Sequence, residues 1–150
     1  MPYPVLRDLV TREICADDAL AAAKLSEELG YPVSPAVMRQ RIESLNGLTD
    51  HIVYVACLAE EVVGWIDVSV TNHLQSEPRA EIGGLVVYSE VRGAGIGCLL
   101  IRCAEQWALQ RGLNGVVVRS QIAREATHRF YLRRGYVRTK TSAVFTKKLG

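Results

Sequence analysis

The chain has 150 residues, of which 49% are hydrophobic, and a formal net charge of +2 at pH 7. This size and composition fit a single domain over residues 1–150 with its own core, and the total charge gives no support to a nucleic-acid-binding protein. No stretch approaches the roughly 20 apolar residues of a membrane span, and the N-terminus lacks a basic segment followed by an apolar run, so we expect a cytoplasmic protein with no membrane partner.

The first half of the chain predicts one strand, two helices and a β-hairpin. Asp17 or Asp18 can cap the first helix, and Ser34 followed by proline is typical of the start of the second. Two runs rich in Val, Ile and Tyr then stand on either side of residues 60–61, the pattern of an antiparallel hairpin. The expected strands are 9–14, 51–59 and 62–71, and the expected helices are 19–29 and 35–45.

The second half predicts a strand, a helix and a parallel strand, followed by a further helix. A polar connection containing Pro78 leads into the strand, and apolar residues recur at helical spacing after it. A strand, a helix and a strand in this order form a right-handed crossover, so we expect an α/β domain with a mixed sheet and about four helices. The expected elements are strand 80–88, a helix from Gly95 to a stop at Gly112, strand 116–118, helix 126–134, and one or two strands within 136–148.

Three alternating glycines, Gly93, Gly95 and Gly97, stand in the stretch VRGAGIGCLL where the crossover helix begins. The first N–H groups of a helix have no partner inside it, and the helix dipole adds positive charge there. Glycines remove the Cβ atoms that would hold a phosphate away, whereas a plain connector would gain little from three of them. The stretch lacks the Gly-Lys-Ser/Thr of a P-loop and the order of a dinucleotide fold, so it indicates another kind of phosphate site.

Cysteine and histidine positions give no metal-binding pattern. Cys15, Cys57, Cys98 and Cys103 form no C-x-x-C pair, and no histidine stands at a matching distance from them. We therefore expect no metal, and cysteines that behave as small buried hydrophobes in a reducing compartment.

Two segments together resemble one enzyme family. Arg92-Gly93-Ala94-Gly95-Ile96-Gly97 resembles the acyl-CoA-binding signature R/Q-x-x-G-x-G/A of the GNAT superfamily of N-acetyltransferases, and residues 126–136, ATHRFYLRRGY, resemble that family's A-x-x-x-F-Y-x-x-x-G-F/Y segment. The order of elements also matches along nearly the whole chain. The resemblance implies a mixed, mostly antiparallel sheet of six to seven strands with about four helices, in which strands 4 and 5 are parallel and splayed.

The resemblance implies transfer of an acetyl group from acetyl-CoA to a primary amine, directly, within a ternary complex. The coenzyme's diphosphate would lie on the turn 92–97, and its pantetheine arm would pair with the strand backbone just before that turn. Where the family often carries asparagine, this chain has Arg124, which leaves the exact coenzyme contacts open. The implied coenzyme-binding residues are Leu85, Val86, Val87, Arg92, Gly93, Ala94, Gly95, Ile96, Gly97, Arg124, Thr127, Phe130 and Tyr131.

Family position also implies the proton-handling residues. Tyr131 would protonate the leaving thiolate, although an aromatic residue on a helix can equally pack against Phe130. Glu81 stands where several members carry a general base; ordered water is the alternative, and Asp67 on the neighbouring strand is a second candidate. A backbone N–H near Val87 would polarise the acetyl carbonyl.

Other functions and partners follow from the same residues. A non-catalytic acyl-CoA-binding or sensing module would keep the glycine turn without the proton-handling residues. The basic region from Arg119 onward could contact nucleic acid, but this would leave the glycines unexplained, so we expect no nucleic-acid partner. The acceptor would be a small-molecule amine or a protein amine that enters beside the first two helices and residues 72–78. The resemblance also makes a homodimer possible, but the sequence itself gives no sign of one.

Overall fold

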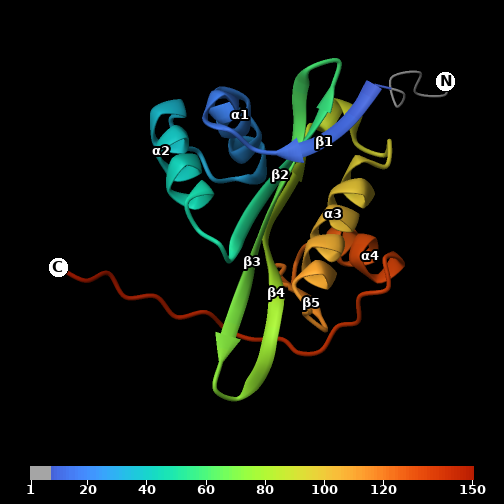
Figure 1. Ribbon diagram of the computed structural model, residues 1–150. Coiled ribbons are helices and arrows are strands. Elements are labelled where there is room, and N and C mark those ends of the chain that lie inside the picture. Colours follow the sequence, from blue (N-terminus) through green and yellow to red (C-terminus); the bar gives the residue numbers. More distant parts are fainter. Residues whose placement is uncertain (1–7) are drawn as a thin grey trace. The chain divides into compact units, whose positions relative to one another are not determined.

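The computed structural model describes residues 8–150 (Figure 1). The chain falls into two compact units, the first ending at Val118 and the second running from Arg119 to Gly150. The first unit contains the whole sheet, whose strands lie in chain order, β1-β2-β3-β4-β5. The strands are β1 (Leu9–Glu13), β2 (His51–Leu58), β3 (Glu61–His73), β4 (Ser76–Val87) and β5 (Val116–Val118).

The pairing within the sheet confirms a mixed, mostly antiparallel arrangement. Strands β1 to β4 pair antiparallel with their neighbours, whereas β5 runs parallel to β4. The parallel pairs join β5 to Ala80, Glu81 and Ile82 of β4. Strand β4 then continues to Val87 without further described pairing to β5. The two parallel strands of the prediction are therefore present, and they are paired over a short stretch only.

Helices cover both faces of the sheet. On one face, α1 (Ala19–Leu29) and α2 (Pro35–Asn46) enclose a core that includes Val53 and Val55 of β2, and Trp65 packs against it. The Trp65 indole N–H also donates to the carbonyl of Ala22 at 3.3 Å. On the other face lies α3 (Ile96–Gln110), and Figure 1 shows it across the sheet from α1 and α2. Side chains of β3 therefore alternate between two apolar layers.

The predicted helix boundaries follow their local signals. Gly30 ends α1 with a left-handed φ of 100°, which residues with a side chain adopt only at a cost. The hydroxyl of Ser34 accepts from the N–H of Val37 at 3.2 Å and so caps α2, with Pro35 at its first position. Both features confirm the boundaries expected from the sequence.

Two strand boundaries differ from the prediction. The β2–β3 turn is formed by Ala59 and Glu60, with φ angles of 48° and 71°, rather than by residues 60–61. Two left-handed residues give the turn a twist that matches that of the flanking strands. Strand β4 begins at Ser76 and contains Pro78, which lies where the register with β3 shifts and before β5 begins to pair. The missing N–H of proline is tolerated at such a place.

The second unit contains one helix, α4 (Glu125–Arg133), which confirms the helix predicted there. The prediction of one or two strands within 136–148 is wrong, because residues 134–150 contain no helix or strand, and the described sheet has five strands rather than six to seven. Val137, Val144 and Phe145 are 77%, 84% and 93% exposed. Strand-forming composition does not create a strand without a partner strand that takes its N–H and C=O groups.

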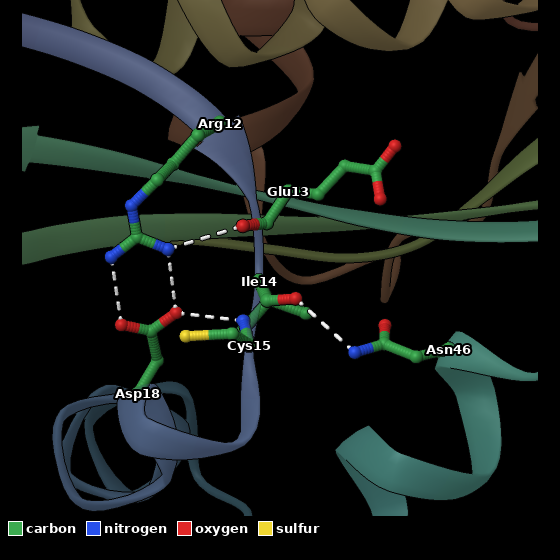
Figure 2. Close-up of polar contacts among 6 residues, drawn as sticks. All are labelled: Arg12, Glu13, Ile14, Cys15, Asp18 and Asn46. Atoms are coloured by element: carbon green, nitrogen blue, oxygen red, sulfur yellow. Dashed lines mark hydrogen bonds and ion pairs between the residues drawn. The ribbon is translucent and has the colours of Figure 1, made fainter.

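An ion pair joins β1 to the start of α1 (Figure 2). Asp18 precedes α1, but its carboxylate does not cap this helix; it accepts two bonds from the guanidinium of Arg12, at 2.8 and 2.9 Å, and one from the N–H of Cys15 at 2.8 Å. The hydrogen bond from Arg12 holds the pKa of Asp18 below its ordinary value, and the N–H of Cys15 acts in the same direction, against the effect of burial.

We expect Asp18→Asn to lower the free energy of unfolding by about 2 kcal/mol at pH 7, because an amide cannot accept both bonds from the guanidinium. A folded-state pKa below the unfolded value of about 3.9 means that the stabilisation is present above that value and lost as the pH falls further. Urea unfolding at several pH values checks both points. Asp17→Asn is the control, because Asp17 is 90% exposed, and an equal loss there would contradict the assignment.

The four cysteines are free, and only Cys57 is buried as expected. Cys15 is exposed, and Cys98 and Cys103 on α3 are partly exposed. Within residues 8–150, no group of His, Cys, Asp or Glu side chains could hold a metal ion. None of the helices in that range has the length and apolar character needed to cross a membrane.

Candidate functional site

The glycine turn leads from the end of β4 into α3. Gly93 and Gly95 have φ angles of 84° and 87°, and a Cβ atom added to either would meet nothing within 4 Å. Gly95 precedes α3, and its carbonyl accepts the N–H of Leu99 at 3.1 Å as the first bond of the helix. The first N–H groups of α3 therefore have no partner inside the helix and lie behind open space. This geometry fits a bound diphosphate.

Arg92 closes the turn against the end of β4. Its Nε donates to the carbonyl of Val87 at 3.0 Å, and its Nη2 lies 4.0 Å from the carboxylate of Glu28 on α1. The side chain is 56% exposed, so it keeps its charge next to the glycines while the bond to Val87 fixes its position. Ile96 is 1% exposed and part of the core, so only its main chain is available to a ligand.

The segment Leu85–Val87 offers backbone rather than side chains. Val86 is buried in the core, and Leu85 and Val87 are partly buried. The pairs with β3 continue along this segment, but the described pairs with β5 stop at Ile82. Among residues 8–150, one edge of β4 thus has no partner strand over residues 85–87, and an extended ligand could pair with it.

A β-bulge interrupts β4 just before this segment, at two adjacent glycines. Asp67 pairs with Gly84 and Val68 with Ile82, so Gly83 is the extra residue. A Cβ atom on Gly84 would lie 2.9 Å from the ring of Trp65, and one on Gly83 would lie 3.4 Å from Oδ1 of Asp67. Gly84 is needed for Trp65 to pack, and Gly83 brings exposed backbone against the Asp67 carboxylate.

The two candidate bases lie on neighbouring strands. Glu81 of β4 is partly buried and pairs with Ser69 of β3 on one side and Val117 of β5 on the other. The Oδ1 atom of Asp67 lies 2.6 Å from Nε2 of His51 on β2, a short hydrogen bond. From the sequence alone, His51 at a strand start is expected to be a surface or hydrogen-bonded histidine rather than a ligand, and in the structure it is hydrogen-bonded. Two signals in the sequence could have identified the pair of His51 and Asp67: the alternation of His51 with Val53 along the strand, and the register of the hairpin.

The remaining predicted site residues belong to the second unit. Tyr131 of α4 is 8% exposed, and its ring lies edge-on to Phe130 and Tyr136, with centroids 5.3 and 5.6 Å away. Burial raises the pKa of the Tyr131 phenol above its ordinary value, and the charge of Arg124 opposes this. Arg124 is exposed just before α4, and Thr127 and Phe130 are partly buried. The unit thus gathers Arg124, Thr127, Phe130 and Tyr131 on one short helix and its start.

Comparison with known proteins identifies the class. Residues 18–136 match the acetyltransferase (GNAT) family. The chain is also 34% identical over 151 residues to the aminoalkylphosphonate N-acetyltransferase of Salmonella typhimurium strain LT2, with 99% of this chain and 94% of that protein covered. The chain belongs to the GNAT family of acetyltransferases. It is an enzyme that transfers an acetyl group to an amine.

Solved structures show the same fold. A transcriptional regulator from Bacillus halodurans C-125 is 24% identical with a TM-score of 0.83, over 93% of this chain and 99% of that one. The aminoglycoside N-acetyltransferase AAC(6')-Iy in complex with CoA is 15% identical with a TM-score of 0.83, over 94% of this chain and 95% of that one. At this identity the two likenesses establish the architecture of the chain and nothing finer.

Proposed function

We propose that the chain acts as a single acetyltransferase domain that transfers an acetyl group from acetyl-CoA to the primary amine of a small molecule, directly, within a ternary complex. The observation that carries this proposal is the open turn at Gly93 and Gly95, which leads from an unpaired edge of β4 to the N-terminus of α3. The turn offers a site for the diphosphate of acetyl-CoA, and the neighbouring edge of β4 offers backbone groups that can pair with its arm.

Acetyl-CoA, when bound, supplies an acetyl group that is already activated as a thioester. The N–H groups at the start of α3 and the charge of Arg92 would hold its diphosphate, and Leu85, Val86 and Val87 would pair with its arm. We place Gly93, Ala94, Gly95, Ile96 and Gly97 in the same site through their main chain. In the second unit, the residues proposed to contact the coenzyme are Arg124, Thr127, Phe130 and Tyr131.

The reaction needs a proton removed from the amine and a proton given to the thiolate. Tyr131 is proposed as the donor, because its raised pKa keeps the phenol protonated at neutral pH. The base is proposed to lie at the sheet end of the site, where burial is partial, with Glu81 as one candidate and Asp67 of the neighbouring strand as the other. A main-chain N–H near Val87 would stabilise the negative charge that develops on the acetyl oxygen during attack.

The acceptor is proposed to be a small amine, with aminoalkylphosphonates as the first compounds to test. The relative that bears this name matches along nearly the whole chain, whereas the aminoglycoside acetyltransferases share the fold at lower identity. A protein amine is the other acceptor that the chemistry allows.

An acceptor panel tests the proposal. Acetyl-CoA at about 100 times its Kd should raise the midpoint of thermal unfolding by roughly 5–10 °C. CoA release should then be followed with an aminoalkylphosphonate, an aminoglycoside, a polyamine and a lysine peptide, and we expect turnover with the small amines. Binding of acetyl-CoA without turnover on any amine would instead favour the non-catalytic binding or sensing module.

A further inference from the structure

A row of polar side chains crosses one face of the sheet beyond its apolar core. His51 of β2 pairs with Ser69 of β3, and Ser69 pairs with Glu81 of β4. Paired residues point to the same face, and Asp67, two residues before Ser69 on β3, shares that face. Val53 and Trp65, which continue the same rows, pack in the core under α1 and α2. The polar row therefore begins where the apolar core ends.

His51 and Asp67 form a close pair within this row. Nε2 of His51 lies 2.6 Å from Oδ1 of Asp67, and the two side chains are 19% and 28% exposed. Within residues 8–150, the structure records no hydrogen bond to Nδ1 of His51 or to the second oxygen of Asp67. Each partner is thus oriented by the other and still has one atom available to a solvent molecule or a ligand.

The pair lies beside the bulge of β4. Asp67 pairs with Gly84, and its Oδ1 lies 3.4 Å from the position that a Cβ atom of Gly83 would occupy. The bulge follows Ile82, the last residue of β4 that pairs with β5. Asp67 is therefore next to the place where the unpaired edge of β4 begins, which is where the proposed acetyl-CoA arm would end.

We propose that Asp67 and His51 are the residues that dock and deprotonate the acceptor amine. The ammonium group docks against Oδ2 of Asp67, and the proton that it loses comes to rest on Nδ1 of His51 through a solvent molecule. One N–H bond of the ammonium breaks and one forms on the imidazole, while the electron pair stays on the amine nitrogen as the nucleophile. The pair changes from a net charge of −1 to zero. This inference depends on the site proposed above.

The chemistry of the pair suits this step. An alkyl ammonium group holds its proton at neutral pH, and histidine is the side chain whose ordinary titration range lies closest to that pH. A carboxylate that accepts from one ring nitrogen fixes the tautomer, leaves the other nitrogen as the acceptor and stabilises the imidazolium that forms. Asp67 therefore orients His51 and binds the ammonium at the same time.

Two charged residues of β4 lie on the same face of the sheet as the pair. Glu81 and Arg79 of β4 share its face of the sheet, and the carboxylate of Asp50, which precedes His51, pairs with Arg111 at 3.3 Å. The buried residues of α1 and α2 are neutral: Ala19, Ala22, Ala23, Leu25, Ser26 and Ile42. Glu81 is thus the carboxylate whose role must be distinguished from that of the pair.

Kinetics of His51→Gln test the proposal, because glutamine still donates to Asp67 but cannot take the proton. We expect kcat/KM for the amine to fall roughly 100-fold or more, with acetyl-CoA affinity within about twofold of wild type. Asp67→Asn should raise KM for the amine about tenfold and also lower kcat.

Controls separate this inference from the function itself. Asp8→Asn changes an exposed carboxylate just before β1, outside the proposed site, and should leave kcat/KM within about twofold of wild type. A kcat/KM for the amine within about threefold of wild type in His51→Gln, or loss of turnover in Glu81→Gln alone, would overturn the proposal. If His51→Gln fails to bind acetyl-CoA, the test of the proposal is the KM and kcat of Asp67→Asn, because that variant leaves the imidazole of His51 in place. Wild-type protein without turnover would contradict the proposed function instead.

Discussion

Gly95→Glu is expected to weaken acetyl-CoA binding by roughly 100-fold or more, because it places bulk and negative charge where the diphosphate should lie. The space in front of Gly95 is open, so the new side chain would occupy that space rather than displace neighbouring atoms. Titration calorimetry with acetyl-CoA and CoA measures the loss. Unchanged affinity would move the coenzyme site away from the turn.

Gly112→Glu is the matched control for this variant. Gly112 follows the other end of α3, has a φ of 72° and, like Gly95, has nothing within 4 Å of an added Cβ atom. Both variants force a residue with a side chain into a left-handed conformation, so both should lose about 1–2 kcal/mol of stability. Only Gly95→Glu should lose binding. Equal losses of binding in both variants would mean that strain, and not the site, is responsible.

Tyr131→Phe is expected to lower kcat by roughly 10²–10⁴-fold, because it removes the proposed donor to the thiolate and keeps the ring. Acetyl-CoA affinity should change by less than about threefold. Since burial raises the pKa of Tyr131, wild-type activity should not lose this acid through the neutral range, and its decline should begin only above about pH 10. Steady-state rates across pH in both proteins check this.

Tyr136→Phe controls for the aromatic cluster. Tyr136 also packs edge-on to Tyr131, so its variant removes a neighbouring hydroxyl from the same cluster and keeps the rings. We expect kcat to remain within about threefold of wild type. A Tyr131→Phe enzyme that is as active as Tyr136→Phe would remove Tyr131 from the mechanism and leave it a packing role.

The sequence predicted those parts of the fold that depend on local signals. Gly30 and Ser34 mark helix ends through their own backbone and hydroxyl chemistry, and both appear as expected. Residues 136–148 show where such signals fail, because their strand-forming composition needs a partner edge that the residues themselves do not specify. The carboxylate of Asp18 likewise binds Arg12 instead of capping α1, a choice made by tertiary contact.

The candidate site likewise contains features that were predictable from the sequence and features that were not. The glycine turn and the bulge at Gly83 were predictable, because only glycine supplies the required φ angles and the close approach. His51 was not identified, since it acquires its partner only when the hairpin register brings β2 against β3. A pair formed across strands leaves no motif in the sequence, although its register could be worked out once the turn at Ala59 was known.

The agreement between strand order and chain order has a consequence for how the protein folds. The β2–β3 and β3–β4 hairpins join neighbours through short turns, so the entropy lost on closing each loop is small. The parallel pairing of β5 with β4 can form only after α3 has packed back across the sheet, and it then adds only a three-residue strand. We therefore expect the antiparallel meander to assemble first and the parallel seam to close last.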